Sequence, residues 1–241
     1  MTTRGKKYTD ATAKLDAGRE YTVDEAMDIV VQAHYAKFDE TVDVAANLGI
    51  DPRHANQQIR SAVVLPHGLG KKITILVFAT DDKAAEARDA GADYVGVDDI
   101  VEKISKENWL DFDVAIATPD VMSKVGRLGK VLGPRGLMPS PKVGTVTSDV
   151  AGMVREAKAG RVEIKNDKSG VIHAPIGKIS FGKQNLKENF LAFMGFLIKE
   201  KPTAAKGVFL KKVSVSATMG PGITVSVPDI RNELKSMGIA A

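Results

Sequence analysis

The order of apolar patterns along the chain restricts its fold more than any other feature. Between His67 and Ala159, the continuous apolar runs KITILVFA, DYVGV and FDVAIAT alternate with the helical stretches DDKAAEARDA, DDIVEKISKEN and SDVAGMVREAKA. Continuous apolar strands separated by helices are typical of a parallel sheet that is covered on both faces. We therefore predict a small doubly wound α/β unit in this block.

The stretch before this block has the patterns of one helix and two strands. Thr22 and Glu25 form a capping box, in which each side chain can bind a backbone N–H of the first turn, so a helix is expected through about Tyr35. From Thr41, apolar residues occupy every second position as far as Ile50, which predicts a half-buried strand. The run SAVVLP predicts a second strand.

After Gly160 the chain returns to amphipathic strands. RVEIK and GVIHAPI flank NDKSG, a turn signal in which Asn166 or Gly170 can take positive φ, so we expect a hairpin there. A helix is expected from about Gln184 to Lys199. The runs GVFLKKVSVSA and ITVSV predict two further strands joined by TMGPG, and PDIRNELKSMG predicts a short surface helix.

Neither flanking stretch has enough strands to close a sheet by itself, so the simplest arrangement is one domain inserted into another. The expected fold is α/β with two domains. Residues 1–67 and 159–241 form an α+β domain whose antiparallel sheet is built from both chain ends, and residues 68–158 form an inserted Rossmann-like three-layer α/β domain. Gly68, Gly70 and Gly160 mark the two crossings, where permissive glycine torsions would allow a hinge.

Composition excludes several classes of protein. The 241 residues include no cysteine, which rules out disulfides, thiolate metal sites and thiol nucleophiles. No apolar run approaches the roughly 18 residues of a membrane span, and the start, MTTRGKKYTD, lacks the apolar core of a secretion signal. We expect a cytoplasmic protein without a membrane partner.

Charge is distributed unevenly along the chain. Residues 1–67 carry 8 Lys and Arg against 10 Asp and Glu, residues 68–158 carry 13 against 14, and residues 159–241 carry 13 against 6. The positive excess therefore lies in the C-terminal third. Two interpretations stay open on this evidence, a polyanionic partner and an ordinary solvated basic face.

The motifs of nucleotide-binding enzymes are not met. Gly70 and Lys71 are followed by Lys72 where a P-loop needs Ser or Thr, and no glycine stands five positions before Gly70. The segment ATDDKAAE after the first strand of the inserted block has no glycine for a pyrophosphate to approach. The four histidines, at 34, 54, 67 and 173, form no two-His helical pair. We expect no enzyme activity, no cofactor and no metal.

One basic segment suggests a contact with phosphate. No acidic residue lies between Val121 and Ser148, where the chain carries five cations: Lys124, Arg127, Lys130, Arg135 and Lys142. Glycine and proline residues separate these cations, so we interpret the segment as a mobile loop. Two hypotheses stay open: secondary contact with a phosphate backbone, and a structural loop that positions the second domain.

Several blocks of sequence carry a specific resemblance. They are KFDETVD at 37–43, LGIDPR at 48–53, LPHGLGK at 65–71, ATPDVM at 117–122, LGPRGLMPSPKVGTV at 132–146, NDKSGVIHAPIGK at 166–178 and TMGP at 218–221. In this order, over nearly the whole chain, they closely resemble the bacterial family of large-subunit ribosomal protein L-one.

The resemblance implies a function and a set of partners. It implies two domains joined by a hinge and binding to ribosomal RNA at the base of a mobile stalk, beside the exit site for deacylated tRNA. It further implies that stalk movement assists tRNA release and that the protein represses its own operon by binding a similar shape in the messenger RNA. An isolated chain is expected to be monomeric, because no heptad or large apolar stripe demands a partner. The alternative is a Rossmann-type small-molecule-binding or catalytic protein.

The matching positions give a candidate RNA-binding set. Structured RNA is recognised through shape, 2′-hydroxyls and phosphates, with some stacking on aromatic rings. The candidates are Lys37, Phe38, Thr41, Lys165, Asp167, Lys168, Ser169, His173, Ser216, Thr218, Met219 and Gly220.

Each candidate also has a structural interpretation. Phe38 stacks on a base or anchors the core, Asp167 accepts from RNA or forms the turn, and His173 contacts RNA or is an ordinary strand residue. The TMGP segment binds RNA or is a plain turn. Lys212 stands where bacterial relatives often have a small polar residue, so it is left out of the set.

Overall fold

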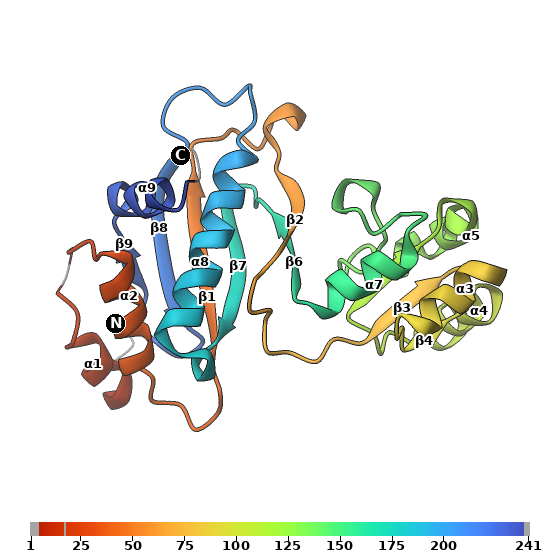
Figure 1. Cartoon of the computed structure of the whole chain (residues 1–241), viewed down its shortest axis with the longest axis horizontal. Coiled ribbons are helices and arrows are strands. Elements are labelled where there is room, and N and C mark those ends of the chain that lie inside the picture. Colours follow the sequence, from red (N-terminus) through yellow and green to blue (C-terminus); the bar gives the residue numbers. More distant parts are fainter. Residues whose placement is uncertain (1–4, 17, 239–241) are drawn as a thin grey trace. The chain divides into compact units, whose positions relative to one another are not determined.

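The computed structural model describes residues 5–16 and 18–238. The chain divides into two compact units, one made from both chain ends up to Gly70 and from Val162 onward, and one made from Lys71–Arg161. Figure 1 labels their helices and strands. The mixed α/β class is confirmed, with one antiparallel and one separate parallel sheet. The division into two hinged domains with boundaries at 67/68 and 158/159 stays a prediction.

The first unit is built on a four-stranded antiparallel sheet with the order β7-β1-β8-β9. The strands are β1 (Thr41–Leu48), β7 (Val171–Lys178), β8 (Leu210–Ala217) and β9 (Ile223–Val225). In β1 the side chains of Val42, Val44, Ala46 and Leu48 are buried and the residues between them are not, which confirms the predicted half-buried strand. β1 pairs with β7 on one side and β8 on the other, so residues from both ends of the chain form one sheet.

Helices pack on the buried face of this sheet. They are α2 (Val23–Gln32), α8 (Gly182–Lys199) and α9 (Val227–Ser236). The unit also contains the shorter elements α1 (Lys6–Thr12), η1 (Ala55–Gln57) and η5 (Ile179–Phe181). Figure 1 shows α8 running along β1 and β7. Both bonds of the capping box between Thr22 and Glu25 are formed, so the predicted helix start is confirmed, although the helix ends three residues before Tyr35. Leu186, Phe190 and Phe193 of α8 are fully buried against the strands.

The strands on either side of NDKSG share one antiparallel bridge, between Asn166 and Ile172, and do not continue into the expected hairpin. β6 (Arg161–Lys165) pairs with β2 (Arg60–Val64) in a separate two-stranded sheet, whereas β7 pairs with β1. Asn166 explains the divergence, because its backbone N–H donates to the Ile59 carbonyl and its side-chain oxygen accepts from the Ile59 N–H at 2.7 Å. The turn itself forms, with Gly170 at φ 78°. The turn signal was correct, and the pairing inferred from it was wrong.

The second unit contains the predicted parallel sheet. The strand order is β4-β3-β5, with β3 (Ile75–Phe78), β4 (Tyr94–Val95) and β5 (Val114–Ala117), and the longer helices are α3 (Asp81–Asp89), α4 (Asp98–Glu107) and α7 (Val150–Lys158). All four residues of β3 are buried. Leu76 belongs to one apolar cluster and Ile75 to another, so the sheet is covered on both faces as the continuous apolar runs predicted.

The basic segment is more ordered than a mobile loop. It forms η2 (Pro119–Val121), α5 (Met122–Val125), η3 (Gly126–Leu128), α6 (Gly129–Leu132) and η4 (Pro141–Val143). Val121, Val125, Leu128 and Leu132 are buried, and their spacing is that of one apolar helical face. Our loop interpretation was therefore wrong for 119–132, because the glycines and cations concealed this periodicity.

The glycines at the two crossings have left-handed backbones. Gly68, Gly70 and Gly160 have φ values of 65°, 66° and 102°. A Cβ on Gly70 would also lie 2.8 Å from the Phe181 ring, so glycine is required there for both conformation and space. Whether these positions act as a hinge stays a prediction. Within residues 5–16 and 18–238, no helix is long and apolar enough to cross a membrane.

A buried amide ties the 67–68 crossing to α8, and its removal is expected to destabilise the fold. Asn189 is fully buried, accepts from the His67 N–H at 3.0 Å and donates to the carbonyls of Gly68 and Ile176 at 3.0 and 2.7 Å. Asn189→Ala leaves these three backbone groups without their partner and should lower the free energy of unfolding by about 2–3 kcal/mol in urea titration. The exposed Gln184→Ala on the same helix serves as the control. Equal stability of the two variants would contradict this account.

Candidate nucleic-acid interface

The face of the antiparallel sheet opposite its helices is polar and accessible; we call it the open face. Because side chains alternate along a strand, every second residue of β1, β7, β8 and β9 points to it. Its members are Asp43, Ala45, Asn47, Val171, His173, Pro175, Lys212, Ser214, Ser216 and Thr224, all exposed or partly exposed. Of the candidate residues, the register brings His173 and Ser216 onto this face directly.

Thr41 and the turn after β8 are locked together at one end of the open face. The Thr218 N–H donates to the Thr41 carbonyl at 3.0 Å, and the Thr41 N–H donates to the Thr218 hydroxyl at 3.1 Å. The Thr218 hydroxyl also donates to the Thr41 carbonyl at 3.2 Å. Its single proton is therefore used within the protein, which leaves a lone pair for an outside donor.

A buried carboxylate fixes the backbone of Met219 in this turn. Glu40 is 0% exposed, and its Oε2 accepts from the Met219 N–H at 2.6 Å. Its Oε1 binds His34 Nδ1 at 2.6 Å and accepts from the Ala36 N–H at 3.4 Å. The Tyr35 hydroxyl donates to the Met219 carbonyl at 2.7 Å. Both backbone groups of Met219 are held, while its side chain remains 49% exposed.

Phe38 is exposed at the same end of the sheet. Its side chain is 53% exposed, so the interpretation as a core anchor is wrong and the ring is accessible for stacking. Lys37 beside it is also exposed. Lys178, which we had not selected, donates to the Thr41 hydroxyl at 2.8 Å and adds a cation here. The pairing of Thr41 with Lys178 in the β1–β7 register produces this contact, and spacing along the sequence does not reveal it.

The 166–170 turn lies at the opposite end of the sheet. Asp167 Oδ1 accepts from the backbone N–H groups of Ser169 and Val171, both at 2.8 Å. These backbone hydrogen bonds, that of Val171 first, lower the pKa of the Asp167 carboxyl. Asp167 therefore has the structural role in the turn, and its contact with RNA stays a prediction. Lys165, Lys168 and Ser169 are exposed around it.

Asp43 is a candidate that sequence reasoning missed. It lies on the open face between Pro175 of β7 and Ser216 of β8. Partial desolvation of its carboxyl on the sheet surface raises its pKa, and the nearby His173 and Lys178 oppose the increase. A carboxylate here can accept from a ribose 2′-hydroxyl, as RNA recognition requires. The sequence did contain a signal for Asp43, because it occupies one of the polar positions that alternate with buried ones in the strand from Thr41.

The raised pKa of Asp43 makes stability depend on pH in a defined direction. The folded state holds the Asp43 proton more tightly than the unfolded state, so this group favours folding at low pH and the contribution is lost as pH rises through the folded pKa. Asp43→Asn should therefore be more stable than the parent at pH 7 by a few tenths of a kcal/mol, given solvent screening. Urea titrations from pH 3 to 7 measure this, and a variant less stable at pH 7 would contradict it.

The five secondary cations lie in the other unit. Lys124, Arg127, Lys130, Arg135 and Lys142 are all exposed. Lys124 is paired with Asp98, a carboxylate distant in sequence, with Nζ to Oδ1 at 2.8 Å. Asp98 therefore lowers the net positive charge around this segment, which the sequence of the segment alone did not show.

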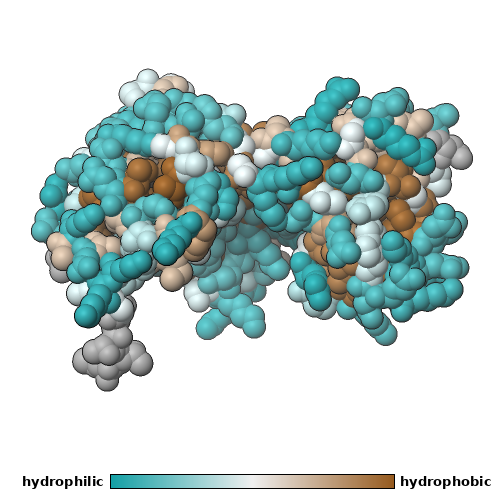
Figure 2. All heavy atoms as spheres, turned by 90° about the horizontal axis from the view of Figure 1, so that it is seen from below, coloured by the Kyte–Doolittle hydropathy of each residue, from teal (hydrophilic) through white to brown (hydrophobic). Residues whose placement is uncertain are grey.

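The surface chemistry agrees with a polar ligand. On the side drawn in Figure 2, hydrophilic residues cover most of both units, and hydrophobic ones occur in small groups. Within the described residues, no three His, Asp or Glu side chains gather as a group that could hold a metal ion. The open face presents hydroxyls and polar side chains, and its ends add cations and the exposed Phe38 ring, which are the groups that bind RNA backbone and bases.

Comparison with known families agrees with this chemistry. The model of the Ribosomal protein L1p/L10e family matches residues 30–221, which include β1, the parallel sheet, the 166–170 turn and the Met219 turn. The chain is thus a ribosomal protein of the large subunit. It belongs to the L1p/L10e family, a family of structural RNA-binding proteins rather than of enzymes.

Proposed function

We propose that the open face and the two turns at its ends bind ribosomal RNA at the base of the mobile stalk beside the tRNA exit site. The ends of this surface present different chemistry: Phe38 and Met219 at one end, and Lys165 and Lys168 at the other. A folded RNA that spans both ends would meet stacking and apolar contact at one, and phosphate pairing at the other.

One observation carries the proposal. Met219 exposes its side chain while its backbone N–H and carbonyl are both held by buried or packed groups, Glu40 and Tyr35. An apolar side chain on a backbone that is held at both its N–H and its carbonyl needs little ordering when a ligand arrives, which is the arrangement of a preorganised contact residue. Phe38 supports the interpretation as a second exposed large apolar side chain, two residues before Glu40, which holds the Met219 N–H.

The finer roles follow from the family resemblance. We infer that opening and closing about Gly68, Gly70 and Gly160 follows stalk movement and helps to release deacylated tRNA. Arg127, Lys130, Arg135 and Lys142 are secondary RNA contacts in this proposal, because their charges are exposed. The same open face binds the operon messenger RNA, which makes the protein a translational repressor. The isolated protein is a monomer, and the ribosome places it in the cytoplasm.

The experiment that tests the location is footprinting on large ribosomal subunits. Subunits reconstituted with and without the protein are probed with hydroxyl radicals, which cleave accessible ribose. We expect protection confined to the stalk base, and loss of that protection with Thr218→Ala/Met219→Ala. Protection elsewhere, with the stalk base cleaved equally in both samples, would refute the proposal. Family membership already argues against the small-molecule or catalytic Rossmann alternative.

A further inference from the structure

Three cations surround a pocket where the end of α8, α9 and the start of β8 meet; we call it the α9 pocket. Lys201 follows the end of α8, and Arg231 and Lys235 extend from α9 one helical turn apart. The pocket has a volume of about 300 Å³. Arg231 and Lys235 lie outside residues 30–221, so the family match does not assign this site.

The three charges are available to an anion. All three side chains are exposed, and within residues 5–16 and 18–238 none of them forms an ion pair. Among the described residues, no carboxylate lines the pocket. Glu233, which stands between two of the cations in the sequence of α9, is paired instead with Lys187 at 3.2 Å.

Helix stability accounts for only part of this cluster. Lys201 and Lys235 lie near the C-terminal ends of α8 and α9, where a cation interacts favourably with the helix dipole. Arg231 lies in the middle of α9, four residues before Lys235, and like charges at this spacing destabilise a helix. A negatively charged ligand between them would remove that repulsion.

The floor of the pocket is apolar. Phe209 and Leu210 are buried there, and Ile198 is partly buried beside them. An apolar floor strengthens electrostatic attraction above it, because less water screens the charges. Arg231 adds a planar guanidinium, whose parallel N–H groups match two oxygens of a phosphate. The pocket therefore has the chemistry of a phosphate site.

Backbone hydrogen bonds connect the floor of this pocket to the 166–170 turn. The Leu48 N–H donates to the Gly170 carbonyl at 3.0 Å. The next residue, Gly49, donates its N–H to the Phe209 carbonyl at 2.6 Å. The turn, the end of β1 and the floor of the pocket are therefore adjacent segments at one end of the sheet.

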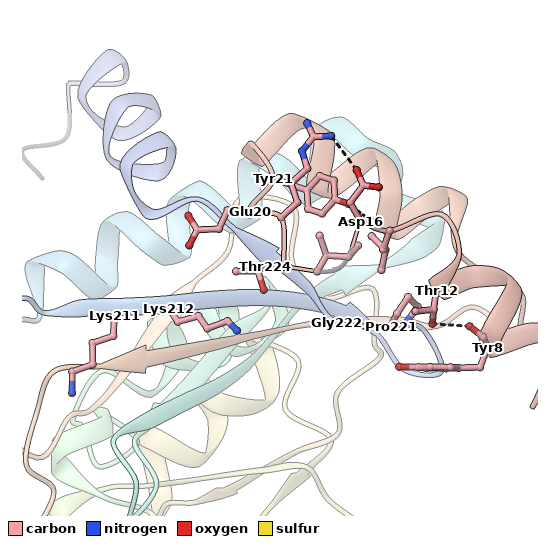
Figure 3. Close-up of a pocket in the computed structure, with 14 residues that line it drawn as sticks. Tyr8, Thr12, Asp16, Glu20, Tyr21, Lys211, Lys212, Pro221, Gly222 and Thr224 are labelled. Atoms are coloured by element: carbon pink, nitrogen blue, oxygen red, sulfur yellow. Dashed lines mark hydrogen bonds and ion pairs between the residues drawn. The ribbon is translucent and has the colours of Figure 1, made fainter. Parts of the chain in front are cut away.

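A bulge in β8 adds a cation beside this junction. The register between β1 and β8 shifts between Asn47 and Leu48, and Lys211 is the extra residue in β8. The Lys211 side chain lies beside Gly49, with its Cε 3.5 Å from the position that a Cβ would take there. Figure 3 shows Lys211 and Lys212 extending from this end of β8. In the described part of the chain, neither lysine makes an ion pair.

We propose that the α9 pocket binds a phosphate of the RNA backbone, and so extends the proposed RNA surface from the 166–170 turn past Lys211 to α9. Lys201, Arg231 and Lys235 pair with the phosphate oxygens. A contact of this kind positions the RNA and does not select its sequence. RNA is favoured over other anions because the pocket adjoins the turn whose lysines are proposed to pair with RNA phosphates. The proposal therefore rests on the RNA-binding function proposed above.

The test compares the affinity of full-length variants for a stalk-base RNA fragment across a salt series. The variant Lys201→Ser/Arg231→Ser/Lys235→Ser removes all three cations of the pocket. Loss of one phosphate contact should reduce the slope of log affinity against log salt by about 0.7–0.9. We expect a reduction of this size.

A control variant removes the same charge elsewhere. Arg88→Ser/Lys103→Ser/Arg155→Ser removes three exposed cations from α3, α4 and α7 of the other unit, none of them a candidate contact. Its slope should equal that of the wild-type protein. Equal slopes for the two triple variants would show that only net charge matters and would overturn the proposal.

A second measurement needs no substitution. Lysine acetylation read by mass spectrometry should show Lys201 and Lys235 protected by the RNA fragment and Lys103 unprotected. Inorganic phosphate and poly-L-glutamate, each at the charge concentration of the saturating RNA, should not protect them. Protection by inorganic phosphate would show a free-ion site, and protection by poly-L-glutamate would show a site for acidic protein; either result overturns the proposal.

The outcomes separate the two proposals. If the wild-type protein fails to prefer the stalk fragment over a scrambled one, the proposed function fails, and the pocket proposal fails with it. If the wild-type protein prefers the stalk fragment but the pocket variant behaves like its control, the pocket proposal fails alone.

Discussion

Replacing Glu40 with alanine is expected to lower the free energy of unfolding by about 2–4 kcal/mol, and to weaken binding of stalk-base RNA by about 10-fold or more. The first effect follows because the substitution leaves the N–H of Met219 and the imidazole of His34 without their buried partner. The second follows because the Met219 turn is no longer held in one conformation before RNA arrives. Urea titration measures the first effect and filter binding the second.

Two further variants separate positioning from general damage. Glu40→Gln keeps the side-chain volume and one acceptor oxygen. It should therefore lose less stability and less RNA affinity than Glu40→Ala. Glu163→Ala removes an exposed carboxylate paired with Arg60 at 3.0 Å and should change stability by less than about 1 kcal/mol. If Glu40 acts through the turn, Glu40→Ala and Met219→Ala should be non-additive in RNA binding. Additive losses, or wild-type binding by Glu40→Ala, would refute the positioning role.

The double substitution Thr218→Ala/Met219→Ala is expected to remove most of the specific affinity for stalk-base RNA, at least about 30-fold at fixed salt. Met219 supplies the exposed apolar contact, and the Thr218 hydroxyl joins the turn to Thr41 through two hydrogen bonds. Loss of such a central contact typically costs about 2 kcal/mol or more in binding. Filter binding at constant ionic strength measures the change.

Val208→Ala is the matched control for this variant. Val208 is an exposed apolar residue, 65% accessible, that lies before β8 and outside the candidate set. Its truncation should leave RNA affinity within about 2-fold, because an isolated exposed apolar side chain carries no binding role. Equal losses from Val208→Ala and the double variant would show that the effect comes from surface chemistry in general.

The sequence predicted those parts of the fold that depend on local pattern. The alternation from Thr41 identified β1, and the pairing of Thr22 with Glu25 identified the start of α2. The continuous apolar run around Ile75 identified a strand buried on both faces. In each case the signal is contained in a few neighbouring residues, so that no knowledge of the tertiary structure was needed.

The errors occurred where distant residues decide the outcome. The strands beside NDKSG separate because Asn166 bonds to Ile59, which is 107 positions away in the chain. The basic segment was interpreted as a loop because its buried residues, such as Val125 and Leu128, alternate with glycines and cations. In this segment, burial of one apolar helical face outweighed the low helix propensity of glycine.

The candidate site was predicted in part. The resemblance supplied Phe38 and Met219, and the structure shows both of them exposed. Glu40 was missed because a carboxylate in a polar stretch gives no sign that it is buried, and acidic residues are rarely fully buried unless paired. The bulge that turns Lys211 outward was missed because bulges arise from strand pairing, which the sequence does not display.

The central claim is that the open face recognises a particular RNA shape, and one measurement tests it most directly. Binding of the wild-type protein to a stalk-base fragment and to a scrambled fragment of equal length is measured over a salt series. Phosphate contacts weaken with salt for both RNAs, whereas shape recognition persists. We predict that the preference for the stalk fragment remains at high salt. Equal affinity for both fragments at every salt concentration would reduce the interaction to charge alone and contradict the account.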